Sequence, residues 1–163
     1  MSFSIIGGAD GPTSVFLAGR LGPDWMNVVG LIIVVLMLIP NVIFARKCPG
    51  EGVSSDNRVI DVLEQVGRYL SIFLMIFPVG APEFGFTSIG AFFVYSIGNS
   101  VCILAYWVIW MMFFHKRSKW KRIMLAIIPT CIFVMSGITA GQILLVVSGI
   151  IFGACHIYTV AKG

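Results

Sequence analysis

The chain has 163 residues, of which 58% are hydrophobic and only 11% charged, and its mean hydropathy is +0.99. Soluble domains carry about 25% charged residues, and a soluble fold of this size has too much surface to cover with so few polar side chains. The composition therefore excludes an ordinary soluble domain and predicts a single-domain membrane protein. The net charge of +4 does not indicate a nucleic-acid partner, because ten of the eleven Lys and Arg residues flank apolar spans.

The first segment, residues 1–25, contains the run GGADGPT at positions 7–13. Its glycines and its proline surround one carboxylate, Asp10, and cannot continue a regular helix. A broken segment can enter a membrane only where protein or water satisfies its backbone, and transporters use such breaks to hold sodium with carbonyl and carboxylate oxygens. We therefore expect a broken or re-entrant segment with Asp10 as a candidate Na⁺ ligand.

The GGADGPT run resembles the β subunit of the sodium-pumping decarboxylases, which act on oxaloacetate, methylmalonyl-CoA or glutaconyl-CoA. The resemblance implies that Asp10 is the ion-binding carboxylate and that its loop is shaped by Gly7, Gly8, Gly11, Pro12 and Thr13. It also implies a partner, a larger biotin-dependent decarboxylase complex in the membrane. Na⁺ is the one ion that the motif suggests, and no covalently bound cofactor is expected.

The resemblance is confined to residues 1–25. That family completes its ion site with a second broken segment, and we find no such segment in the rest of this chain. No Ser/His/Asp set, phosphate loop or pair of carboxylates can be assembled either. We therefore expect that the chain is not a complete pump and has no enzymatic activity alone.

The remainder, residues 26–163, contains five apolar spans, each near the roughly 20 residues that cross a bilayer. They cover about 26–45, 67–81, 89–114, 123–138 and 142–161. Residues 58–66 show helical spacing and are interpreted as an amphipathic lead-in at the membrane interface. The predicted fold class is an all-α membrane bundle of about five transmembrane helices. The runs IPNVIFA at 39–45 and EQVGR at 64–68 resemble uncharacterised small bacterial multi-pass membrane proteins.

Basic residues predict the topology. With five spans, every Lys and Arg except Arg20 falls on one side of the membrane. The positive-inside rule then places that side in the cytoplasm. We expect a multi-pass protein of the plasma membrane with its N-terminus outside and its C-terminus in the cytoplasm.

Polar residues inside the spans have structural interpretations. Asn99 and Ser100 are expected to bond neighbouring helices, and Glu64 and Arg68 to pair along one helix face. His156 is expected to have a hydrogen-bonded packing role rather than relay protons, because the sequence places no carboxylate opposite it. Ordinary kinks are expected at the prolines within the spans, Pro40, Pro78 and Pro129.

Small residues in the last span, Gly149, Gly153 and Ala154, favour close helix contact, either within the chain or in a homo-oligomer. The cysteines form no zinc-like spacing, so we expect neither a metal–thiolate site nor a disulfide framework; they are Cys48, Cys102, Cys131 and Cys155.

Three functional hypotheses remain open. The first is a non-enzymatic membrane protein carrying a decarboxylase-like front segment. The second is a sodium transport or coupling component that uses Asp10. The third is a subunit that docks on a larger partner.

Overall fold

The computed structural model describes residues 26–49, 57–77, 79 and 89–162. These residues are almost entirely helical and contain no strand, which confirms the predicted all-α class. The described helices are α1 (Val28–Lys47), α2 (Arg58–Ile76), α3 (Ile89–His115), α4 (Lys119–Thr139) and α5 (Ile143–Lys162). Residues 1–25, with the expected broken segment, lie outside the described part of the chain.

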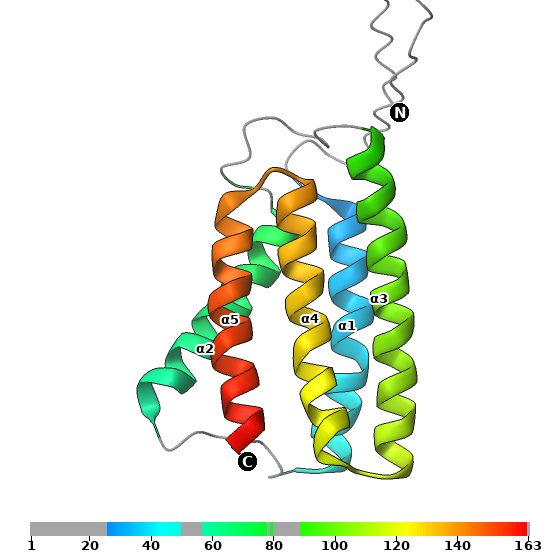
Figure 1. The fold of residues 1–163 in the computed structure, drawn as a ribbon, viewed down its shortest axis with the longest axis vertical. Coiled ribbons are helices and arrows are strands. Elements are labelled where there is room, and N and C mark those ends of the chain that lie inside the picture. The colour runs from blue at the N-terminus through cyan, green and yellow to red at the C-terminus, as the bar shows by residue number, and fades with distance from the viewer. Residues whose placement is uncertain (1–25, 50–56, 78, 80–88, 163) are drawn as a thin grey trace, which may run out of the picture.

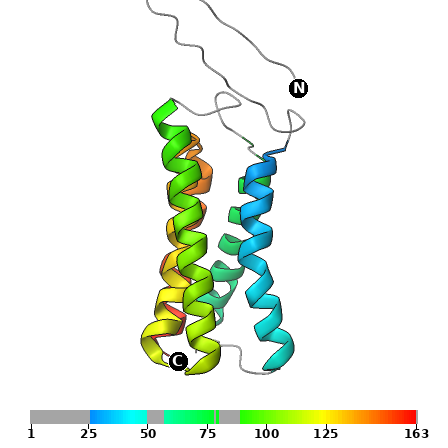
Figure 2. The same ribbon diagram turned by 90° about the vertical axis from the view of Figure 1, so that its right-hand side faces the viewer.

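The helices form one elongated bundle in which α1, α3 and α5 run in one direction and α2 and α4 in the other (Figures 1 and 2). Helix α4 packs between α3 and α5, and α2 packs against α5 in a second layer that it shares with α1. Helix α1 contacts both α2 and α3. Four of the described helices (all but α2) are long and apolar enough to cross a membrane, so the chain is a multi-pass membrane protein.

Helix α2 buries its polar face and exposes its apolar face, which is the reverse of a surface helix in a soluble protein. Glu64 and Ser71 are buried, whereas Val62, Val66 and Tyr69 are each more than half exposed. An apolar outer face is costly in water but favourable in lipid, and a polar inner face requires partners within the protein. This burial pattern is that of a helix in a bilayer and supports α2 as the fifth span, although its charged residues, among them Asp61, Glu64 and Arg68, set it apart from the four apolar helices.

The bounds of α2 differ from the predicted lead-in and span, 58–66 and 67–81. One continuous helix begins after Asn57, whose side chain accepts a hydrogen bond of 3.0 Å from the Val59 amide. It ends at Ile76, because Phe77 is extended with φ −112° and ψ 100°. The residue after Phe77 is a proline, which disfavours the helical conformation in the residue before it.

The basic residues of the described helices gather at the end of the bundle where α5 finishes (Figure 1). The exception is Arg68, which lies within α2. Lys121 has a structural role at this end: its Nζ donates to the Met112 and Lys116 carbonyls at 2.9 and 2.8 Å. A buried ammonium group therefore caps the last turn of α3 and fixes the corner with α4.

Buried polar contacts join α3 to α4. The Asn99 side chain donates to Ser136 Oγ at 3.1 Å, as the predicted bonding role requires. Ser100 does not take part, because it is exposed and its hydroxyl donates to the Ser96 carbonyl of its own helix. Pro40 and Pro129 lie inside α1 and α4, and both helices continue through them.

Candidate functional site

The interface of α2 and α5 brings polar groups into the interior of the bundle. Gly67 allows the close approach: a Cβ added there would lie 3.0 Å from the Phe152 amide nitrogen. One further turn along, Ser71 Oγ donates to Ser148 Oγ at 3.0 Å, and both residues are buried. Helix contacts of this kind, with a small residue at the closest point, are typical of membrane proteins.

The candidate site is the cluster formed by Glu64, Arg68 and His156, to which we refer as the carboxylate–imidazole cluster. Glu64 is only 7% exposed. Its Oε1 accepts a hydrogen bond from the Arg68 guanidinium one helical turn away, which confirms the predicted intrahelical pair. The same oxygen lies 3.1 Å from Nδ1 of His156 on α5. Thr159 is buried beside the carboxylate.

The geometry shows the hydrogen-bonded contact expected of His156, but it contradicts the premise that no carboxylate lies opposite the imidazole. A carboxylate does lie opposite the imidazole, but it comes from a residue 92 positions away in the chain, so sequence spacing could not reveal it. An ionised carboxylate only accepts hydrogen bonds, so Nδ1 of His156 is the donor.

Phe152 completes the surroundings of the cluster. Its ring stacks on the His156 ring with centroids 5.1 Å apart and an interplanar angle of 17°. The Arg68 guanidinium carbon lies 5.6 Å from the same ring centroid. One aromatic ring therefore contacts both Arg68 and His156.

The cluster lies inside the bundle rather than at its end. Glu64 is six residues from the first residue of α2, and His156 is six residues from the last residue of α5. At the rise of an α-helix, both positions are about 9 Å inside the basic end. Ionisable residues at such a depth are costly and are characteristic of functional sites.

The predicted motif residues have no described position. Asp10, Gly7, Gly8, Gly11, Pro12 and Thr13 all lie within residues 1–25, outside the part of the chain that the structure describes. Within the described part, no three His, Cys, Asp or Glu side chains are placed to hold a metal ion together. The four cysteines are free thiols.

The small residues of α5 serve contacts within the chain. A Cβ added at Gly149 would lie 3.0 Å from the Phe133 Cβ, and one added at Gly153 would meet the Thr130 side chain, both on α4. Ala154, by contrast, is exposed. The glycine spacing is therefore explained by the α4–α5 contact.

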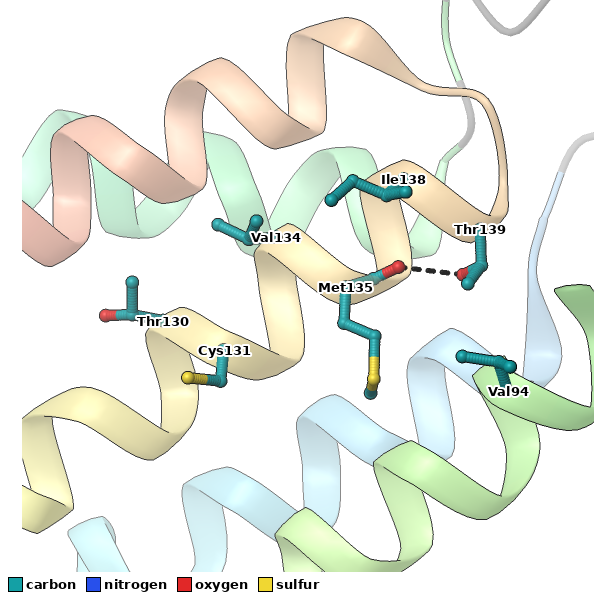
Figure 3. Close-up of a pocket in the computed structure, with 7 residues that line it drawn as sticks. All are labelled: Val94, Thr130, Cys131, Val134, Met135, Ile138 and Thr139. Carbon is teal, nitrogen blue, oxygen red and sulfur yellow. Dashed lines mark hydrogen bonds between the residues drawn. The ribbon is translucent and has the colours of Figure 1, made fainter.

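An open apolar groove of about 500 Å³ lies on α4 beside the start of α3 (Figure 3). Figure 3 shows that the side chains come almost entirely from one face of α4: Thr130, Cys131, Val134, Met135, Ile138 and Thr139, with Val94 from α3. The hydroxyl of Thr139 is used by its own helix, donating to the Met135 carbonyl at 2.8 Å. The Thr130 hydroxyl likewise donates to the Ala126 carbonyl of its own helix at 3.0 Å, and apart from the Cys131 thiol the other lining side chains are apolar.

In comparisons with known proteins, no family model, curated protein or solved structure matches this chain.

Proposed function

We propose that this chain is a membrane component that binds and transfers protons, with Glu64 and His156 as the proton-binding pair. The single observation that carries the proposal is the 3.1 Å contact of these two side chains inside an apolar bundle. A carboxylate and an imidazole in contact can share and release one proton, and Arg68 balances the carboxylate charge. A purely structural contact could use neutral side chains, as Ser71 and Ser148 do one turn further along.

Proton flux in proteoliposomes tests the proposal. Full-length protein is reconstituted into vesicles that contain a pH-sensitive dye. A membrane potential that is negative inside the vesicles is then imposed with potassium and valinomycin. We expect wild-type vesicles to acidify and Glu64→Gln to slow acidification by about tenfold or more, the effect of losing a positioned proton-transfer group. His156→Gln is expected to have a similar effect.

The matched control is Asp61→Asn, which neutralises the other described carboxylate of α2, within one turn of Glu64. This variant should acidify at the wild-type rate. Wild-type flux in Glu64→Gln, or equal losses in Glu64→Gln and Asp61→Asn, would contradict the proposal. Circular dichroism and elution volume in detergent establish that the variants compared are folded.

The GGADGPT run at 7–13 supports a second candidate, a sodium transport or coupling component in which Asp10 binds the ion. The same vesicles distinguish the two. Uptake of ²²Na⁺ that is lost in Asp10→Asn and retained in Glu64→Gln would favour sodium coupling through the front segment. Purification of a stoichiometric biotin-containing partner from the native membrane would support a decarboxylase-like complex.

The orientation is proposed from the basic end of the bundle. Because the ends of α1, α3 and α5 share that end, the positive-inside rule places it in the cytoplasm of the cell, with the N-terminus outside the plasma membrane. Alkaline phosphatase fused after Gly163 is expected to be inactive, whereas green fluorescent protein fused there should fluoresce. Active phosphatase at that position would reverse the orientation.

A further inference from the structure

The ends of α1 and α3 meet around a group of aromatic side chains, Phe44 of α1 and Trp110, Phe113 and Phe114 of α3, which we call the aromatic cluster. The Phe44 ring centroid lies 5.4 Å from that of Trp110, 5.8 Å from Phe113 and 6.4 Å from Phe114. Trp110 and Phe113 are buried, while Phe114 is 41% exposed. The cluster therefore forms a rigid platform that is open on one side.

Two cations lie on this platform, each over a ring of the other helix. Nζ of Lys47, the last residue of α1, is 5.7 Å from the Phe114 ring centroid. The guanidinium carbon of Arg117, which follows α3, is 5.8 Å from the Phe44 ring centroid. Arg117 also donates to the Cys48 thiol at 2.8 Å. These crossed contacts fix the direction of side chains that are ordinarily free to move.

The charge at this point is strongly positive. Residues 26–49 and 89–162 contain no Asp or Glu, and the two helix ends carry Arg46, Lys47, Lys116 and Arg117. The dipoles of α1 and α3 supply about −0.5 charge each at their C-terminal ends, which offsets only a minor part of four positive charges. The site therefore has charge complementarity to an anionic group.

Apolar side chains continue from the same place along the lipid-facing surface. Val42 and Ile43 of α1 are 47% and 40% exposed, and Met111 and Met112 of α3 are 62% and 43% exposed. A ligand with one anionic group and long apolar chains would contact both regions at once. A phospholipid has this chemistry, whereas free phosphate would use the cations alone.

We propose that Lys47 and Arg117 hold the phosphate of an anionic phospholipid against the aromatic cluster, with its acyl chains along the exposed side chains of α1 and α3. The platform fixes the cations before the lipid arrives, so little side-chain freedom is lost on binding. The site is specific in position: Lys162, at the same end, lies over the Tyr158 ring of its own helix, whereas Lys47 and Arg117 each lie over a ring of the neighbouring helix. It is also independent of the carboxylate–imidazole cluster, which lies between α2 and α5.

Native mass spectrometry of the full-length protein in detergent tests the site. The protein is titrated with phosphatidylglycerol or phosphatidylcholine of the same acyl chains. We expect wild type to prefer phosphatidylglycerol, and Lys47→Gln/Arg117→Gln to weaken its binding on the order of tenfold, since each basic residue near an anionic lipid contributes several-fold. Lys47→Arg/Arg117→Lys keeps both charges and is expected to retain most of the affinity.

The matched control is Arg58→Gln/Lys119→Gln, which removes two exposed charges at the starts of α2 and α4, at the same end of the bundle. Its affinity for phosphatidylglycerol should stay within about twofold of wild type, because long-range attraction between exposed charges is screened. Equal losses in the two double variants, or no preference for phosphatidylglycerol in wild type, would overturn the proposal. If the Lys47/Arg117 double variant does not fold, Lys47→Gln and Arg117→Gln are measured singly. Each is expected to lose several-fold, and wild-type affinity in both would overturn the proposal.

Discussion

Gly67→Leu is expected to lower the free energy of unfolding in detergent by about 3 kcal/mol or more, because it forces a large side chain into the α2–α5 contact. Even a Cβ atom at this position would lie 3.0 Å from the Phe152 amide nitrogen and 3.1 Å from its Cα. Backbone atoms of a packed helix cannot move aside as the end of a flexible side chain can. The helices must therefore separate, and their other contacts weaken as well.

Thermal unfolding followed by circular dichroism measures the loss. Gly67→Ala should be milder than Gly67→Leu, since a single methyl group needs a shift of only a few tenths of an ångström. Val66→Leu is the matched control, because Val66 is 56% exposed on the lipid-facing side of the same helix. A Gly67→Leu protein as stable as Val66→Leu would show that α2 does not pack on α5 through this glycine.

Glu64→Ala is expected to cost about 2 kcal/mol, because it leaves the Arg68 guanidinium and the His156 Nδ1–H without the carboxylate that accepts from both. The cost stays below the roughly 3–5 kcal/mol of a fully buried broken pair, since the Arg68 side chain is 34% exposed rather than fully buried. Chemical denaturation in mixed micelles provides the measurement.

A double-mutant cycle separates the ion pair from simple packing loss. Arg68→Met removes the orphaned charge, so Glu64→Ala/Arg68→Met should be less destabilised than the sum of the single variants. Glu64→Gln preserves the shape and retains one acceptor oxygen, so it should be more stable than Glu64→Ala. Additive single effects would mean that Glu64 and Arg68 do not interact in the folded protein.

The fold could be predicted from the sequence largely because the thickness of the bilayer fixes how many apolar residues each membrane-spanning helix needs. The spans predicted at 89–114 and 142–161 are close to α3 and α5, since these helices are apolar along nearly their whole length. The bounds of helices that begin with charged residues were harder to predict. Helix α4 begins at Lys119 rather than 123, because long basic side chains remain helical while their charges reach the interface. In α2 the charges at the start of the helix made residues 58–66 look like an interfacial lead-in to the span, whereas they form one helix with it.

The candidate site could be predicted only within one helix. The Glu64–Arg68 pair follows from a spacing of four residues, which brings side chains together on any α-helix. The contact of Glu64 with His156 depends on how α2 packs against α5, and nothing in the local sequence of either helix specifies that pairing. Gly67 is the one clue that sequence contained, a small residue on the polar face of an amphipathic helix, but it does not identify the partner helix.

The reversed polarity of α2 has a consequence for biogenesis. At the centre of a membrane helix, each Asp, Glu, Lys or Arg costs about 2.5–3.5 kcal/mol during insertion, so Glu64 and Arg68 make α2 a poor independent substrate for the insertion machinery. Their partner His156 belongs to α5, the last described helix to emerge during synthesis. Helix α2 can therefore reach its final position only after α5 has been synthesised, when α2 packs against it.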